Sequence, residues 1–143
     1  MNAVALPDGG RLSIATAGAG PPLLLLRPLG GSIVSWGSFA DALARRFRVV
    51  MLDHRGAGCS SAASIPTSTR AMAADAVAVL DALGIARAAV YGISLGGMVA
   101  SWLALDAPDR VAGLVLASTP TRGRALHTGG WRRAVDFARC MVR

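Results

Sequence analysis

The serine at position 94 stands in a setting that could make it a nucleophile. Residues 91–97 read Tyr-Gly-Ile-Ser-Leu-Gly-Gly, with an apolar, strand-like run before them and a helix-like run after them. A serine at a sharp turn from strand to helix exposes its hydroxyl, which can then attack a carbonyl carbon. Such a strained turn needs neighbours with almost no side chain, and Gly92 and Gly96 meet that need. The predicted chemistry is acyl transfer through Ser94.

A second glycine-rich segment could stabilise the negative charge that develops during this attack. Residues 27–32 read Arg-Pro-Leu-Gly-Gly-Ser and follow the first strong apolar run. An acyl-transfer site needs two backbone N–H groups aimed at the oxyanion, one from the residue after the nucleophile and one from an earlier loop. Leu95 supplies the first. Because Pro28 has no N–H, we expect Leu29 to supply the second, with Gly30 allowing the backbone to approach the substrate. Taken alone the segment could be an ordinary turn; its order relative to the serine favours an oxyanion hole.

A serine of this kind needs an acid and then a histidine later in the chain. After Ser94, only Asp106 or Asp109 together with His127 have this order. Asp106 lies about eleven residues along the helix expected to begin at residue 95, which puts it on the order of 16 Å from the serine. Asp109 is expected at the same far edge. We therefore expect the acid and the histidine to be missing from this chain, and a role for His127 stays open.

Strands and helices alternate around these residues. Residues 4–6 and 11–16 predict a β-hairpin, since Pro-Asp-Gly-Gly separates them. Apolar runs predict four further strands, at 23–26, 48–52, 88–91 and 111–116, while helical spacing of apolar residues occurs at 36–47, 72–83 and 95–105. Residues 98–105 are apolar all round, which predicts a helix covered on every side. The alternation predicts a mostly parallel α/β sheet covered on both faces.

Three motifs, in this order, resemble the α/β-hydrolase superfamily. They are Leu-Leu-Arg-Pro-Leu-Gly-Gly at 25–31, Asp-His-Arg-Gly-Ala-Gly-Cys-Ser at 53–60 and Gly-Ile-Ser-Leu-Gly-Gly-Met at 92–98. Within it, the chain most resembles 3-oxoadipate enol-lactonases and related esterases. The resemblance implies a serine hydrolase of a small ester or lactone, and we expect neither a cofactor nor a metal ion. Arg27 stands where many members carry histidine.

The resemblance covers roughly the N-terminal half of the family's domain. It implies that residues 1–121 form the N-terminal part of the core, truncated after the strand that follows the nucleophile helix, and that residues 122–143 begin a cap or lid. The family's domain continues through two further strands that carry the acid and the histidine. Residues 131–143 have a basic amphipathic pattern. We interpret them as the first cap helix, although such a helix could instead bind a membrane or a partner.

The third motif, at 53–60, is interpreted as structural. His54 precedes Ser94, against the order of the family, so we do not expect it to be catalytic. Asp53 and Arg55 are expected to brace the loop after their strand through backbone and mutual hydrogen bonds. Glycines 56 and 58 are expected at positive φ.

Composition bounds the possible classes of protein. The chain has 143 residues, of which 53% are hydrophobic, so one folded domain is expected rather than disorder. The net charge of +7 comes from arginines, six of which lie in residues 122–143. We interpret them as solvated side chains and expect neither nucleic acid nor a membrane as partner. There is no basic-then-apolar leader and no long apolar run, and Cys59 and Cys140 lack metal-ligand spacing, so a cytoplasmic protein with reduced thiols is expected.

Three functions remain open at this point. The first is the serine hydrolase of a small-molecule ester or lactone. The second is an inactive truncated product, or one half of a split assembly, because strand 111–116 would expose an apolar edge that invites self-association or a complementing chain. The third is a dinucleotide-binding module, but Ser94 occupies the place where that fingerprint needs its second glycine.

Overall fold

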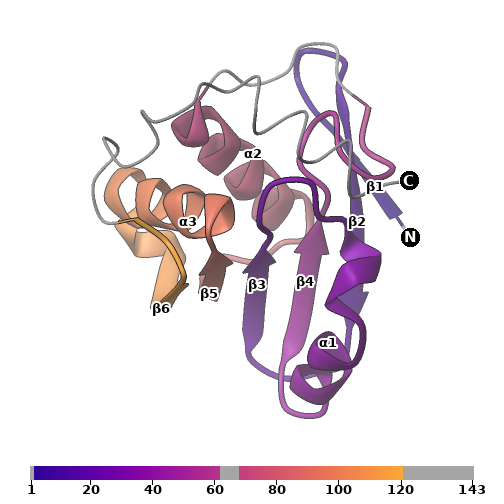
Figure 1. Cartoon of the computed structure of the whole chain (residues 1–143), viewed down its shortest axis with the longest axis vertical. Coiled ribbons are helices and arrows are strands. Elements are labelled where there is room, and N and C mark those ends of the chain that lie inside the picture. The colour runs from indigo at the N-terminus through magenta and orange to yellow at the C-terminus, as the bar shows by residue number, and fades with distance from the viewer. Residues whose placement is uncertain (1, 62–67, 121–143) are drawn as a thin grey trace.

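A computed structural model describes residues 2–61 and 68–120 (Figure 1). Within them, the strands form one sheet in the order β1-β2-β4-β3-β5-β6. Their bounds are β1 (Asn2–Ala5), β2 (Arg11–Ala17), β3 (Pro22–Leu26), β4 (Arg48–Leu52), β5 (Ala88–Ile93) and β6 (Val111–Ala117). Strands β4, β3, β5 and β6 run parallel, and the hairpin β1–β2 joins them antiparallel through β2 and β4. The predicted mostly parallel sheet with an N-terminal hairpin is confirmed.

Helices connect the parallel strands. A 3-10 helix, η1 (Ile33–Trp36), leads into α1 (Gly37–Ala44), while α2 (Thr69–Ala82) and α3 (Leu95–Asp106) are longer; a short η2 (Pro108–Arg110) precedes β6. The first helix is shorter than the predicted 36–47, because the chain must turn back after Ala44 to enter β4. The second ends as predicted, with Gly84 at φ +64° just beyond it.

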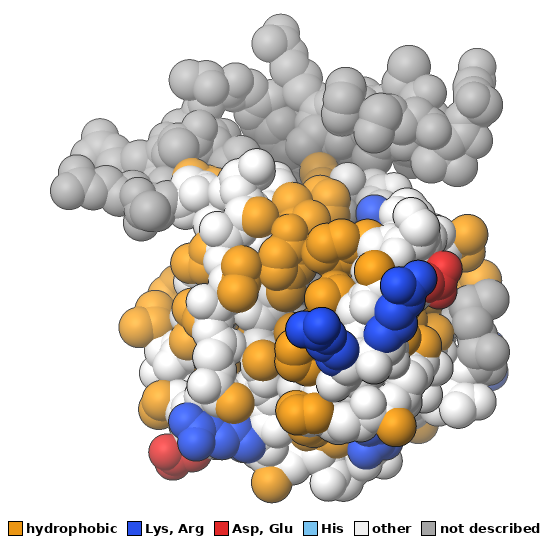
Figure 2. Space-filling model, turned by 90° about the horizontal axis from the view of Figure 1, so that it is seen from below, with side chains coloured by type: hydrophobic (Ala, Val, Ile, Leu, Met, Phe, Trp, Pro, Cys, Tyr) orange, Lys and Arg blue, Asp and Glu red, His pale blue; other side chains and the backbone are white. Residues whose placement is uncertain are grey.

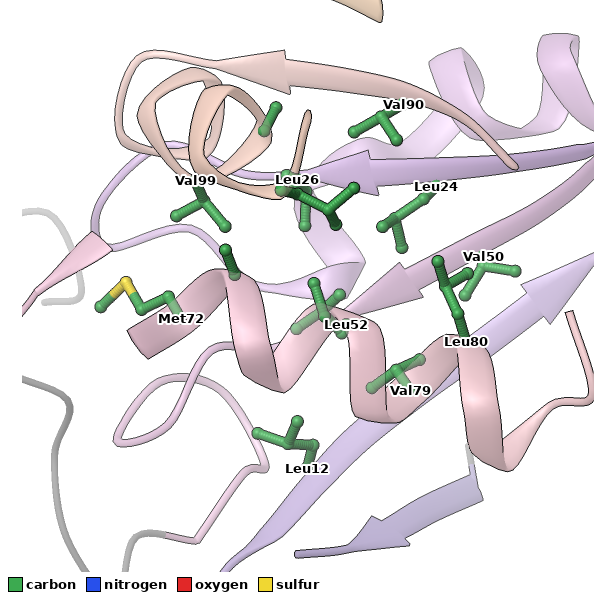
Figure 3. Packing of buried hydrophobic residues seen from close by; sticks show 14 of the residues in the cluster. Leu12, Leu24, Leu26, Val50, Leu52, Met72, Val79, Leu80, Val90 and Val99 are labelled. Carbon is green, nitrogen blue, oxygen red and sulfur yellow. The ribbon is translucent and has the colours of Figure 1, made fainter. Parts of the chain in front are cut away.

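The larger core lies between the sheet and the pair α2 and α3 (Figure 3). It contains side chains from β3, β5, α2 and α3 that are at most 1% exposed, namely Leu24, Leu26, Val90, Val79, Leu80, Val99 and Leu103. Burying each such side chain stabilises the fold by about 1.5–3 kcal/mol. The core therefore fixes β3, β5 and α3, the elements that position the serine turn.

The opposite face of the sheet is covered by α1 and η1. There Trp36 and Ala40 pack against Leu25, Val49 and Met51. At the edge of the sheet, β6 exposes large apolar side chains on both faces. Leu114, which pairs with Val90 of the larger core, is 40% exposed and Leu116 is 42% exposed, while Val115, which pairs with Tyr91 on the α1 side, is 53% exposed. Figure 2 shows the molecule from below, with hydrophobic side chains gathered in the middle of the visible surface. In the described residues β6 is an apolar edge strand, as the sequence predicted.

The prediction that the third helix is covered on every side was wrong. In α3, Trp102 is 37% exposed and Leu105 is 71% exposed. The helix packs on the sheet with one face and on α2 with another, and its remaining surface has no covering element among the described residues. The Trp102 ring instead lies beneath the Arg70 guanidinium, whose central carbon is 5.0 Å from the ring centroid.

No helix in the described ranges is both long enough and apolar enough to cross a membrane.

Candidate active site

Ser94 forms the sharp turn between β5 and α3. Its backbone has φ +52° and ψ −114°, a conformation that non-glycine residues avoid and that costs about 1–3 kcal/mol. Hydrogen bonds hold this conformation in place. The Ser94 N–H donates to the carbonyl oxygen of Ala117 at 2.9 Å, and the Thr119 hydroxyl donates to the Ser94 carbonyl at 2.8 Å. The side chain that carries the candidate nucleophile therefore leaves a strained and tightly held backbone.

The glycines on either side of Ser94 are required by close backbone contacts. A Cβ atom on Gly92 would lie 2.4 Å from the carbonyl oxygen of Gly96, and one on Gly96 would lie 2.1 Å from the carbonyl oxygen of Leu26. Real Cβ atoms do not approach other atoms so closely. The contact with Leu26 presses the start of α3 against the end of β3, where the loop of residues 27–32 begins. The two predicted amide donors thus come from neighbouring segments.

The amides of Leu29 and Leu95 are available as donors. Among the described residues, neither N–H donates a hydrogen bond to a protein acceptor. Leu95 is the first residue of α3, whose first N–H groups have no acceptor within the helix and attract negative charge. Gly30, beside Leu29, has φ +75°. The Ser94 turn and the loop of residues 27–32 both lie at the end of the sheet to which the arrowheads of β3 and β4 point (Figure 1).

Asp53 and Arg55 brace their loop, but not through each other as the sequence suggested. The Asp53 carboxylate accepts two backbone N–H bonds, from Ile33 at 2.6 Å and from Cys59 at 3.0 Å. Arg55 forms a two-pronged ion pair with Asp75 at 2.8 and 2.7 Å, and it also bonds to Asp8. The hydrogen bonds to Asp75 raise the pKa of Arg55. Arg55 thus ties the loop to α2 while Asp53 ties it to the segment after β3.

Arg27 lies inside the loop that carries Leu29. It is 9% exposed, its Nη1 donates to the Ser32 carbonyl at 2.6 Å, and its guanidinium carbon lies 4.7 Å from the centroid of the Trp36 ring. Burial lowers the pKa of Arg27, and the negative charge of Asp53 opposes that effect. Arg27 therefore holds residues 28–32 from within.

A model of the alpha/beta hydrolase fold family matches residues 21–138, most of the chain. The chain belongs to the α/β-hydrolase fold family. A relative from Azorhizobium caulinodans that carries the name carbamate hydrolase RutD is 39% identical over 122 residues, which are 85% of this chain and 42% of RutD.

Solved α/β-hydrolase structures superimpose on the chain. A hydrolase from Pseudomonas aeruginosa has a TM-score of 0.79 at 41% identity, over 82% of this chain and 45% of that one. The enol-lactonase from Burkholderia xenovorans also has a TM-score of 0.79, at 31% identity, over 85% of this chain and 48% of that one. This α/β-hydrolase chain therefore spans less than half the length of these relatives.

The other candidates for a triad do not join Ser94 in the described part of this α/β-hydrolase. Asp106 ends α3, at the opposite end from the serine, and its carboxylate pairs with Arg70 at 2.7 and 2.8 Å. Asp109 lies in η2, next to the start of β6. His127 and the expected cap at 122–143 lie outside the described residues. Among those that are described, no three histidine, cysteine or acidic side chains are grouped as metal ligands.

Two contributors to the α/β-hydrolase site were missed from the sequence, namely Thr119 as the partner of the Ser94 carbonyl and Asp53 as a tie to the loop after β3. A signal for both existed. Each follows a parallel strand, and the carboxyl ends of parallel strands meet at one edge of the sheet. What no pattern could reveal is which backbone group each side chain would reach.

His54 is buried, and neither of its ring nitrogens has a hydrogen-bond partner among the described residues. Burial lowers its pKa, against the smaller opposing effects of Asp75 and Asp53. This places His54 in the interior as a neutral side chain.

The buried neutral His54 should make stability depend on pH. In the unfolded chain its pKa is about 6.5, so as the pH falls the unfolded state takes up a proton before the folded state does. The contribution of His54 to the free energy of unfolding is fully present above about pH 6.5. It is lost as the pH falls toward the pKa of His54 in the folded state, with a slope of at most about 1.4 kcal/mol per pH unit. Urea unfolding between pH 7.5 and 5.5 measures it. His54→Gln should flatten the slope; a His54→Gln protein that keeps the wild-type slope would refute the assignment.

Proposed function

We propose that this chain supplies the nucleophile and the oxyanion hole of an α/β-hydrolase that cleaves a small ester or lactone. The Ser94 hydroxyl attacks the carbonyl carbon, and the amides of Leu29 and Leu95 stabilise the oxyanion. Collapse of the oxyanion breaks the bond between the carbonyl carbon and the ester oxygen, and that oxygen leaves as an alcohol with the proton that the serine gives up; in a lactone the alcohol stays attached to the acyl chain. Water then attacks the acyl-serine, which restores the serine hydroxyl and leaves a carboxylic acid. The observation that supports this best is the strained Ser94 turn, whose Gly96 lies against the end of β3, together with the Leu29 and Leu95 amides, which donate to no acceptor among the described residues.

The names of the relatives agree with a carbonyl substrate. One is named for a carbamate and another for an enol-lactone, and each of these compounds contains a carbonyl bonded to a heteroatom. Attack at such a carbonyl produces an oxyanion in every case. An ester or lactone is our choice for this chain, and carbamates are the first compounds to test beside it.

We expect the chain to react slowly by itself. Ser94 has no general base among the described residues, and in a serine protease of a different fold the oxyanion hole and binding alone gave about 10³–10⁴-fold over water. The acid and the histidine belong, in our proposal, to the part of the relatives that this chain does not span. The first step, acylation of Ser94, is thus the step to measure.

The experiment uses p-nitrophenyl acetate as an activated ester. Acylation should release p-nitrophenol and add one acetyl group to the intact protein. Peptide mass spectrometry should place that group on Ser94. Folded protein that gains no acetyl group at this residue would contradict the proposed function.

We propose that the edge of β6 pairs with the segment corresponding to the remaining length of the relatives. The exposed side chains of Leu114, Val115 and Leu116 support this, because an apolar edge strand favours pairing. The chain alone should therefore self-associate as its concentration rises, as measured by size-exclusion chromatography with light scattering. Val115→Lys should shift the protein toward monomer, while Val34→Lys, at a residue 76% exposed in η1, should not. A wild-type chain that stays monomeric throughout would refute this proposal.

We also propose a cytoplasmic location. Cys59 is free and exposed, which suits a reducing compartment. Fractionation of cells with an antibody against the chain would test it.

A further inference from the structure

We propose that Asp53 is a positioning residue that, together with Arg27, sets the direction of the Leu29 amide in the oxyanion hole. This inference rests on the proposed function. It concerns a side chain that follows β4 and that does not need to touch the substrate.

Asp53 is held rigidly after β4. It is 2% exposed, its N–H donates to the carbonyl of Ser13 at 3.0 Å, and its carbonyl accepts from the Ser60 hydroxyl at 2.7 Å. Its two carboxylate oxygens accept from the amides of Ile33 and Cys59. Two hydrogen bonds therefore fix the Asp53 backbone, and two more hold its carboxylate.

The carboxylate also packs closely against the loop that follows it. A Cβ atom on Gly58 would lie 2.0 Å from Asp53 Oδ2, so the backbone of the 53–60 loop packs directly against it. Each carboxylate oxygen accepts one backbone N–H, so the side chain links the loop after β4 to the segment after β3. The bond from the Ile33 amide to Asp53 fixes the segment after β3 relative to the end of β4.

The loop that contains Leu29 is held near its far end by two charged side chains. The Ile33 amide is bound by Asp53 at 2.6 Å, and the adjacent Ser32 carbonyl is bound by Arg27 at 2.6 Å. At its near end the loop continues from β3, against which Gly96 packs. Leu29 lies between these fixed points, so the direction of its N–H depends on both.

Asp53→Asn should loosen one of these ties while nearly preserving the shape of the side chain. An amide has one oxygen where the carboxylate has two, so its NH₂ group must face either the Ile33 or the Cys59 amide. Small errors in the position of a reacting group can cost about 100-fold, and loss of one oxyanion donor costs about 10²–10³-fold. We expect acetylation of Ser94 by p-nitrophenyl acetate to slow by about 10- to 100-fold.

A second substrate separates positioning from a merely structural role. In the thiono analogue of p-nitrophenyl acetate, sulfur replaces the carbonyl oxygen, and sulfur accepts hydrogen bonds weakly. The ratio of the oxo rate to the thiono rate therefore reports how well the hole donates. Asp53→Asn should lower this ratio, whereas partial unfolding would lower both rates equally.

Asp75→Asn is the matched control. It removes the same charge at another buried aspartate, which pairs with Arg55 and makes no hydrogen bond to the loop of residues 27–32 in the described part of the chain. It should lower stability and leave the oxo/thiono ratio at the wild-type value. If Asp53→Asn does not fold, Arg27→Met tests the other tie and should lower the ratio in the same way.

The outcomes separate this inference from the proposed function. If wild-type Ser94 is not acetylated, both are overturned. If it is acetylated and a folded Asp53→Asn protein keeps the wild-type ratio, the inference is wrong and the proposed function stands. If only Arg27→Met folds, an unchanged ratio in that variant likewise overturns the inference.

Discussion

Alanine at position 94 is expected to abolish acetylation by p-nitrophenyl acetate, because it removes the hydroxyl that attacks the ester. The rate of acetyl incorporation should fall from the wild-type value to the background of nonspecific labelling. In a serine protease of a different fold that has a complete triad, loss of the serine lowered the rate by about 10⁶-fold. Here the base is absent from the described residues, so the drop is bounded by the slow wild-type rate. The measurement is acetyl mass against time on intact protein.

Ser101→Ala supplies the matched control. Ser101 lies in the same helix, α3, and its hydroxyl donates to the Gly97 carbonyl at 2.9 Å. Its loss should leave acetylation unchanged. Equal labelling of wild type and Ser94→Ala would show that the acetyl group goes elsewhere, and the assignment of the nucleophile would fail.

Gly96→Ala is expected to lower the free energy of unfolding far more than the same substitution at Gly113. The added Cβ would lie 2.1 Å from the Leu26 carbonyl oxygen and 2.7 Å from that of Arg27, and both atoms are backbone. Neither can rotate away, so α3 must shift from the end of β3. Overpacking typically costs 1–3 kcal/mol, and we expect a loss of about 3 kcal/mol or more. That is a large part of the 5–15 kcal/mol that holds a typical domain together. Urea unfolding measures it.

Gly113→Ala tests whether the effect is specific. Gly113 lies in β6, and no atom of the described residues comes within 4 Å of where its Cβ would be. The free energy of unfolding of this variant should lie within about 0.5 kcal/mol of the wild-type value, as it does for ordinary surface substitutions. A Gly96→Ala protein with the wild-type urea midpoint would show that the start of α3 is not pressed against β3.

The sheet and the serine turn could be predicted because local patterns determine them. Continuous apolar runs mark strands covered on both faces, and β3 and β4 confirmed this. The spacing Gly92, Ser94, Gly96 is also local, and the contacts of both glycines explain it. The catalytic role of Ser94 and the donor roles of Leu29 and Leu95 stay predictions.

What could not be predicted depends on contacts between residues distant in the sequence. Asp53 was expected to bond with Arg55, two residues away, but it reaches Ile33 and Cys59 instead. Arg55 in turn reaches Asp75 on α2. The exposure of Leu105 depends on which elements cover α3, and apolar composition does not determine that.

The backbone of the serine turn is hydrogen-bonded to the end of β6, an edge strand in the described residues. The Ser94 N–H bonds to Ala117 at the end of β6, and Thr119, just beyond, bonds to the Ser94 carbonyl. Local opening at this end of β6 would break both hydrogen bonds of the strained Ser94 backbone at once. Segments with few buried apolar contacts open at the lowest cost in free energy. If the proposed function and the proposed pairing at β6 both hold, they are coupled, because a segment that pairs with β6 would also hold the Ser94 backbone in place.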